Sequence, residues 1–375
     1  MKVWISPPSI ARQLILTSTL VITIATSVLC FWHFTPREKL IIGGALTGSK
    51  VIGEQFPKTI IDPIGQDYSL AAPAKRIVSA ILAGDEMLQQ LNAQNHVISV
   101  THLADDAIFS NVVGDYPKSI HRNHAEIEEI LSMTPDLVIV APYTNAITVR
   151  LLLANQIPVM RFPQYNSFED IADNIALLAE VLDKKEQAQI VVKQMWQRIR
   201  LIECLVKSEP KPRVLYLTLN GATTGTGTLT DEMIRYAGGI NVISETGITG
   251  MTRLTHEYAV SLRPDVLFLT DWFAKTKWEA LRKLNEDPLW QDVPAVINKR
   301  IFIISAKISG TVTPHRVKGI EALAAELHPS LYSSQNKNCC ALSGMKSSIN
   351  KNTCNKNLNT KTTLLPNAMN QGETS

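Results

Sequence analysis

The chain has 375 residues, of which 45% are hydrophobic and 19% charged, with 18 Gly and 19 Pro. This composition excludes a wholly disordered chain, a collagen-like chain and a disulfide scaffold, and the length predicts two domains. The formal net charge is +3, but residues 331–375 hold five Lys and one acidic residue, so residues 1–330 have a net charge of −1. A nucleic-acid-binding protein concentrates basic residues on its folded part, so we expect no nucleic-acid partner.

Residues 1–35 are predicted to be a signal peptide or a membrane anchor. Lys2 and Arg12 precede residues 14–32, a run without charged residues, and this order is typical of export signals. Three outcomes stay open: cleavage after the small residues 25–27, lipidation at Cys30, and retention as an anchor, because the run approaches the ~20 residues that span a bilayer. We therefore expect a periplasmic or extracytoplasmic protein. Residues 36–58 are Gly-rich and aperiodic, and are predicted to be a tether.

Few cysteines belong to the part that is expected to fold. Cys339, Cys340 and Cys354 lie beyond residue 330, and no Cys-x-x-Cys motif occurs, which gives no support to a zinc or redox site. With Cys204 as the single cysteine of the folded part, we expect no internal disulfide.

Short β-branched runs alternate with amphipathic stretches through residues 59–166, the expected N-terminal lobe. Strands are predicted at 77–79, 97–100, 137–140 and 159–162, and helices at 85–91, 126–133 and 145–154. This alternation implies a parallel sheet covered by helices.

Residues 167–209 are predicted to be a linking helix. No Pro or Gly occurs from 167 to 207, apolar residues recur with helical spacing, and Ser167 and Asp170 form a capping-box pattern. A break at 183–185 would divide the helix, and its second half alone could reach about 35 Å, enough to connect two lobes.

The alternation resumes in residues 210–329, the expected C-terminal lobe. Strands are predicted at 214–219, 266–269 and 301–304, and helices at 230–237, 256–262, 278–284 and 313–327. Residues 128–140 and 257–269 both read as helix, Pro-Asp turn and buried strand, which favours two similar lobes. The predicted fold class is therefore α/β with two Rossmann-like lobes. Residues 330–375 hold nine Asn and few apolar residues, and are predicted to be a disordered tail.

No motif assembles an enzyme active site. No Gly-x-Ser-x-Gly or His-Glu-x-x-His occurs. The Gly-rich residues 221–228 lack the third Gly of a dinucleotide fingerprint and the Lys of a P-loop, so we expect a flexible turn before a capped helix, where Thr226 could face a ligand. Residues 121–124 are expected to form a loop. His102, His121 and His315 are kept as alternative zinc or manganese ligands.

Aromatic and polar residues follow several predicted strands, where ligands bind in open α/β sheets. Aromatic side chains there suit a large, flat ligand held by stacking and area burial. The candidate ligand-binding residues of this kind are Tyr143, Asn145, Tyr165, Trp272 and Phe273.

Over residues 57–329 the chain resembles the substrate-binding proteins of ABC importers for ferric siderophores, haem and cobalamin. The motifs that carry the resemblance are residues 76–79, 126–140, 157–159, 167–171, 225–228 with Asp231, 238–241, 263–265, 287–290 and 319–323. The resemblance implies two lobes joined by a rigid helix, with a ligand cleft between them. It also implies capture of an iron complex or corrinoid and delivery to a permease and its ATPase, with no cofactor, and we expect a monomer.

Several residue roles follow from this resemblance alone. Glu128 and Glu257 correspond to surface glutamates that pair with permease arginines, and Arg316 is expected to bind ligand. Residues 80–86 and 313–316 depart from the family pattern, which leaves the ligand's identity open. The alternatives are a zinc or manganese receptor and a sensor or enzyme domain on the same fold.

Overall fold

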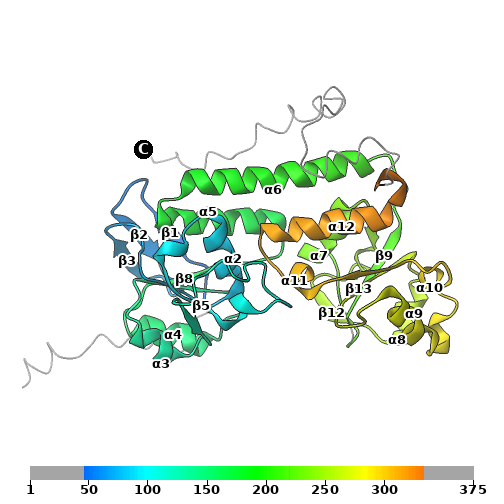
Figure 1. Ribbon diagram of the computed structural model, residues 1–375, viewed down its shortest axis with the longest axis horizontal. Coiled ribbons are helices and arrows are strands. Elements are labelled where there is room, and N and C mark those ends of the chain that lie inside the picture. The colour runs from blue at the N-terminus through cyan, green and yellow to red at the C-terminus, as the bar shows by residue number, and fades with distance from the viewer. Residues whose placement is uncertain (1–45, 219, 333–375) are drawn as a thin grey trace, which may run out of the picture. The chain divides into compact units, whose positions relative to one another are not determined.

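The computed structural model describes residues 46–218 and 220–332 (Figure 1). The predicted signal or anchor, and the tail beyond residue 332, lie outside the described residues. Two parallel sheets, one of five strands and one of four, form the centres of two α/β lobes, and two smaller antiparallel sheets accompany them. This arrangement confirms the predicted α/β fold with two lobes. Within the described ranges, no helix is long and apolar enough to cross a membrane.

The N-terminal lobe is built on a parallel sheet with strand order β6-β5-β4-β7-β8. Its strands are β4 (Ile77–Ser79), β5 (Val97–Thr101), β6 (His121–Asn123), β7 (Leu137–Val140) and β8 (Val159–Arg161). Its helices are α2 (Leu82–Gln90), α3 (Ile127–Ser132) and α4 (Ala146–Ala154). The prediction of a loop at 121–124 was wrong, since residues 121–123 pair with β5. This edge strand is short and polar, so it has no hydrophobic pattern to predict it.

A small antiparallel sheet precedes this lobe. It consists of β1 (Lys50–Ile52), β2 (Lys58–Ile61) and β3 (Asp67–Leu70). β1 lies inside the segment predicted to be a tether, so that prediction was wrong for its last part. Lys58 is 1% exposed, and its Nζ donates to the carbonyl oxygen of Glu180 at 2.9 Å and pairs with the Glu180 carboxylate. This partly buried ion pair attaches the small sheet to the connecting helices.

Two helices connect the lobes, α5 (Phe168–Leu182) and α6 (Lys185–Val206). The Ser167–Asp170 capping box starts α5, and Asp183 ends it with a left-handed φ of 55°, which confirms the break anticipated at 183–185. α6 has 22 residues, which corresponds to about 33 Å. It packs against α5 along one part of its length and against α7 and α12 of the C-terminal lobe along another (Figure 1).

The C-terminal lobe is built on a parallel sheet with strand order β11-β9-β13-β14. Its strands are β9 (Arg213–Leu217), β11 (Ile240–Asn241), β13 (Val266–Thr270) and β14 (Ile301–Ile304). Its helices are α7 (Leu229–Tyr236), α8 (His256–Ser261), α9 (Lys277–Asn285), α10 (Pro294–Ile297), α11 (Ala306–Ser309) and α12 (Val317–Leu327). β10 (Ala222–Thr224) pairs with β12 (Met251–Arg253). The Gly-rich segment is therefore partly a strand, and Thr228 caps α7 by accepting from the amide of Asp231.

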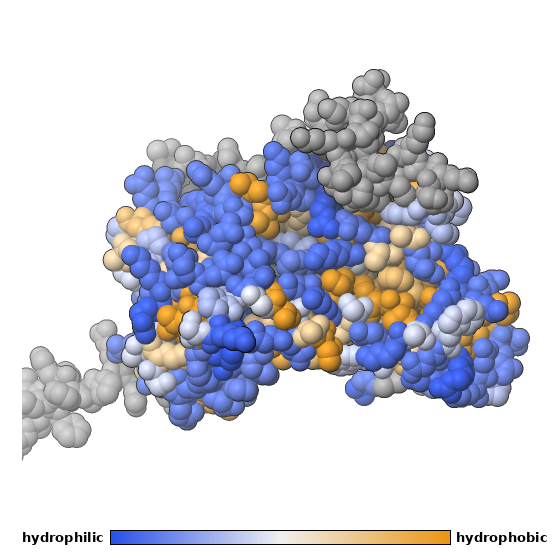
Figure 2. Space-filling view, in the orientation of Figure 1, coloured by the Kyte–Doolittle hydropathy of each residue, from blue (hydrophilic) through white to orange (hydrophobic). Residues whose placement is uncertain are grey.

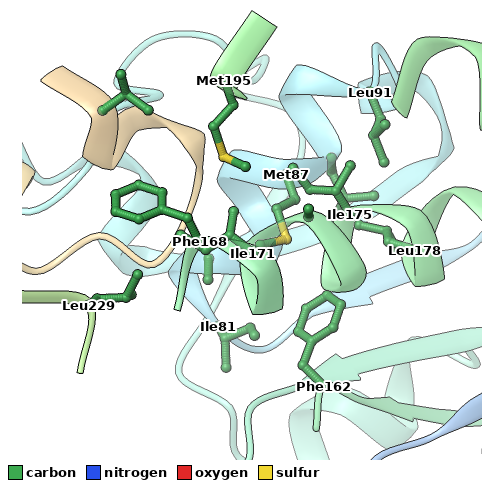
Figure 3. Close-up of a cluster of buried hydrophobic side chains, with 14 of the residues drawn as sticks. Ile81, Met87, Leu91, Phe162, Phe168, Ile171, Ile175, Leu178, Met195 and Leu229 are labelled. Atoms are coloured by element: carbon green, nitrogen blue, oxygen red, sulfur yellow. The ribbon is translucent and has the colours of Figure 1, made fainter. Parts of the chain in front are cut away.

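One hydrophobic core runs through both lobes. It includes buried residues of the first sheet, of the connecting helices and of the second sheet, for example Ile77, Ile199 and Val266. Figure 3 shows Met87 of α2 and Met195 of α6 lying close to Phe168 of α5, with Leu229 of α7 nearby. The continuous core couples the lobes on the side of the connecting helices.

The repeat predicted at 128–140 and 257–269 extends to matching hydrogen bonds. Arg76, just before β4, donates through its side chain to the carbonyl oxygens of residues 133 and 134, and its amide donates to Asp136. Arg213, which begins β9, makes the same bonds to residues 262 and 263 and to Asp265. The residues before the two prolines also match, because Thr134 and Arg263 each have a φ of 45°. The two lobes therefore share one local design.

Cys204 of α6 is disulfide-bonded. The other four cysteines of the chain lie outside the described residues. A disulfide of Cys204 was not predicted, because the prediction concerned only a disulfide within the folded part. Sequence spacing carried no signal for it, because a disulfide depends on the three-dimensional approach of two cysteines.

Candidate ligand-binding site

The two lobes meet at the carboxyl ends of their central strands. Phe109 of the N-terminal lobe contacts Trp272, which follows β13, edge to face, with ring centroids 5.5 Å apart. Trp272 is 57% exposed, so most of its ring is open to a ligand. Trp272, which was named because it follows a predicted strand, is thus an exposed aromatic residue that contacts the other lobe. Phe109 was not predicted, because it lies in a long loop without a periodic pattern.

Two predicted tyrosines lie together in the N-terminal lobe. The rings of Tyr143, after β7, and Tyr165, after β8, are 6.3 Å apart, and Phe162 contacts Tyr165 at 5.9 Å. Tyr143 is 72% exposed. The Tyr165 hydroxyl is buried without a hydrogen-bond partner among the described residues, and burial raises the pKa of this side chain well above its usual value. The pair offers an aromatic surface with a hydroxyl donor behind it.

Three other predicted ligand residues have local structural contacts. The Asn145 side chain accepts from the amide of Ile147 at 2.8 Å and caps α4. Thr226 is exposed, and its amide donates to the carbonyl oxygen of Ile248. Phe273 packs into the second hydrophobic cluster and lines a hollow within the C-terminal lobe together with Lys283. The Phe273 side chain therefore lies within its own lobe, unlike that of its neighbour Trp272.

Arg316 is buried rather than open to solvent. It is 3% exposed, and Nη2 donates to Thr230 Oγ1 at 2.9 Å while Nη1 reaches the carbonyl oxygen of Thr311 at 3.4 Å. Within the described part of the chain, its Nε has no hydrogen-bond partner and the guanidinium forms no ion pair. Burial lowers the pKa of Arg316 to about 10. A buried cation without a counter-ion is costly, and it raises the electrostatic potential around it.

The alternative metal ligands do not converge. His102 stacks on His124 with centroids 4.5 Å apart, and His121 pairs with Glu129. His315 precedes α12 in the other lobe, and burial lowers its pKa. Among residues 46–218 and 220–332, no group of three His, Cys, Asp or Glu side chains could hold a metal ion.

A buried polar cluster between the lobes was not predicted. Glu86 and Asn111 of the N-terminal lobe are hydrogen-bonded to Lys307, Thr311 and Thr313 of the C-terminal lobe. The only sequence signals were the departures of residues 80–86 and 313–316 from the family pattern, and these do not reveal that the two segments contact each other.

The two predicted docking glutamates occupy equivalent exposed places. Glu128 is in the first turn of α3 and Glu257 in the first turn of α8, and each helix precedes the Pro-Asp turn of the repeat. Neither forms an ion pair in the described part of the chain. Figure 1 shows both helices on the sides of their lobes that face away from α6.

Hydrophilic residues cover most of the face drawn in Figure 2, and hydrophobic residues gather mainly over the C-terminal lobe near β13. Exposed apolar surface of this kind is typical of a surface that binds a ligand or a partner.

The model of the periplasmic binding protein family matches residues 77–308, and the chain belongs to this family. The uncharacterised ABC transporter substrate-binding lipoprotein YvrC of Bacillus subtilis is 24% identical over 294 residues, which cover 74% of this chain and 88% of the relative. The vitamin B12-binding protein of Vibrio parahaemolyticus is 22% identical over 255 residues, which cover 66% of this chain and 87% of the relative. The periplasmic heme-binding protein RhuT from Roseiflexus has the same fold, with a TM-score of 0.59, 23% identity, and coverage of 68% of this chain and 99% of that one. The resemblance read from the motifs is confirmed.

Proposed function

We propose that this protein captures a metal chelate between its lobes, either an iron–siderophore complex, haem or a corrinoid, and delivers it to the permease and ATPase of an ABC importer. The relatives support this class, since one binds vitamin B12 and a protein of the same fold binds haem. The single observation that carries the proposal is the pair of exposed aromatic residues, Tyr143 and Trp272, at the carboxyl ends of strands in the two lobes. A flat, apolar chelate would bury area against both rings.

The buried charge of Arg316 supports an anionic chelate. Arg316 is a buried cation with no ion-pair partner among the described residues. In a low-dielectric setting its field weakens slowly with distance, so a ligand carrying carboxylate, phosphate or hydroxamate charge would be favoured.

The experiment is a ligand titration of the full chain in mild detergent, read by tryptophan quenching and thermal shift. Haem, cobalamin, several ferric siderophores and Zn²⁺ are tested separately. We expect one chelate to bind and to raise the melting temperature as its concentration rises. A response to Zn²⁺ with silence from every chelate would support the metal receptor instead.

Matched tryptophan variants locate the site. Trp272→Ala should weaken binding about tenfold or more, because it removes a large stacking surface. Trp278→Ala is the control, since Trp278 is 68% exposed in the same lobe but lies at the start of α9 under Lys299. Equal losses in the two variants would contradict the site.

Delivery is proposed to use Glu128 and Glu257, one on each lobe. Arginine–carboxylate pairing is geometrically specific, and matching carboxylates on two similar lobes suit a two-fold partner. With the permease and ATPase in liposomes, Glu128→Gln and Glu257→Gln should each reduce stimulated ATP hydrolysis several-fold. Glu126→Gln, a change at an exposed residue two positions before Glu128, should leave the stimulated ATP hydrolysis unchanged. No effect from either docking variant would refute this mode of docking.

We place the protein outside the cytoplasm as a monomer, held at the membrane by its N-terminal segment or released by cleavage. The disulfide of Cys204 supports this location, because disulfides persist in oxidising compartments.

A further inference from the structure

Glu86 is a buried carboxylate that accepts hydrogen bonds from both lobes. It lies in α2 and is 1% exposed. Within its own lobe, Oε1 accepts from the amide and the side-chain nitrogen of Asn111, at 3.0 and 2.9 Å. From the other lobe, the hydroxyls of Thr311 and Thr313 both donate to Oε2 at 2.6 Å. Four donors from two lobes therefore surround one carboxylate.

The partners of Glu86 belong to one short segment of the C-terminal lobe. Thr311 and Thr313 lie between α11 and α12, and the Asn111 side chain also donates to the carbonyl oxygen of Lys307 in α11, at 3.1 Å. Two separate pieces of the N-terminal lobe, α2 and the loop at Asn111, thus hold the same segment. In the described ranges Glu86 has no ion-pair partner, so these neutral donors are what stabilises its buried oxygens.

The neighbouring acidic residue shows that hydrogen bonding to the other lobe is not a general property of the acidic side chains of α2. Asp85 is also buried, but its oxygens accept from the amide and hydroxyl of Thr101, at the end of β5 in the same lobe. The two consecutive acidic residues therefore make different connections. Asp85 attaches α2 to its own sheet, and Glu86 attaches α2 to the other lobe.

The Glu86 cluster also differs from the other links between the lobes. The continuous apolar core joins them through α5 and α6 and has no directional requirement. Hydrogen bonds to a carboxylate depend steeply on distance and angle. This cluster lies at the end of each sheet where Phe109 meets Trp272, so it can set a separation that the apolar core cannot.

We infer that Glu86 is a positioning residue that fixes the spacing of the two lobes at their ligand-facing edges. It holds the ligand-free protein near one lobe separation and so limits which ligands fit. The consequence for ligand choice rests on the proposed function, but the coupling of the lobes does not.

Hydrogen exchange in the ligand-free full chain tests the coupling, with peptides covering residues 106–116 and 305–313. Thr313→Val keeps the side-chain volume and removes one donor to Glu86. We expect exchange to rise about tenfold in residues 106–116, across the interface, as well as in residues 305–313. Thr223→Val is the matched control, because Thr223 is equally buried and its hydroxyl donates to Tyr216 within the C-terminal lobe. Thr223→Val should leave hydrogen exchange in residues 106–116 unchanged.

A second variant keeps the test decisive if Thr313→Val is unstable. Glu86→Gln retains size but presents an amide nitrogen to donor groups, and it should raise exchange in residues 305–313 from the opposite side. Exchange that rises only in the lobe carrying the substitution, for both variants, would overturn the proposal. Because no ligand is used, this outcome is separate from any failure to find a chelate. Where a chelate does bind, Glu86→Gln should weaken its binding several-fold, although residue 86 does not contact the chelate.

Discussion

Replacing Arg316 with Met should stabilise the ligand-free protein while weakening ligand binding. The guanidinium is 3% exposed, Nε has no partner among the described residues, and one well-formed hydrogen bond joins Nη2 to Thr230 Oγ1. A residue kept for folding would be expected to have its buried charge paired. We therefore propose that this cation is retained for a ligand.

The magnitude follows from the pKa of Arg316. Burial lowers this pKa from 12.5 to about 10, and at 1.36 kcal/mol per unit this disfavours the charged form by about 3 kcal/mol. The penalty is fully present below pH 10, where the folded-state guanidinium is protonated. Met removes it and loses the hydrogen bond to Thr230, which is worth about 1.5 kcal/mol. The free energy of unfolding should therefore rise by about 1–2 kcal/mol.

Urea unfolding without ligand measures the first effect, and chelate titration measures the second. Arg198→Met is the contrasting variant, because Arg198 makes a bidentate pair with Glu321 at 2.8 and 2.7 Å and its loss should destabilise the protein. A decrease of more than about 1 kcal/mol in Arg316→Met would show that Arg316 is structural and refute the reasoning.

Three further predictions concern single residues. Burial raises the pKa of Asp85 well above its ordinary 3.8, so the folded protein holds a proton that the unfolded chain releases, and stability should fall as pH rises above about 4. Urea unfolding at several pH values should show this slope flattened in Asp85→Asn; an unchanged slope would contradict it. Non-reducing peptide mapping should find Cys204 joined to another cysteine, whereas a Cys204 that alkylates without reductant would refute the disulfide. Ser167→Ala should lower the free energy of unfolding by about 1 kcal/mol through loss of the α5 capping box, and no change would show that the cap is dispensable.

The strands that were predicted with correct limits are short runs of mainly apolar residues in the two parallel sheets. β4, β7 and β14 have the same limits in sequence and structure, because a continuous apolar run can be stable only inside a covered parallel sheet. Seven strands were missed: β1, β2, β3, β6, β10, β11 and β12. Each has two to four residues, and each is formed by hydrogen bonds to a partner strand that local sequence does not specify.

The candidate site was predictable as a location and only partly as a set of residues. Aromatic residues after strands β7, β8 and β13 could be named, because parallel strands bring their carboxyl ends to one edge. The orientation of neighbouring side chains could not: Trp272 lies beside Phe109 of the other lobe, whereas Phe273 packs within its own lobe. A one-residue step along a loop changes the direction of a side chain without changing its chemistry.

The sequence by itself determined the family, the two α/β lobes and the helical connection, because these depend on hydrophobic periodicity and on local signals such as caps and Pro-Asp turns. Only the tertiary structure decided how the lobes contact each other. Asp85 and Glu86 are adjacent acids on one helix, yet one is bonded within its lobe and the other to residues more than 200 positions away. That difference is set by which groups the fold brings within hydrogen-bond distance, a property of the folded chain and not of either residue.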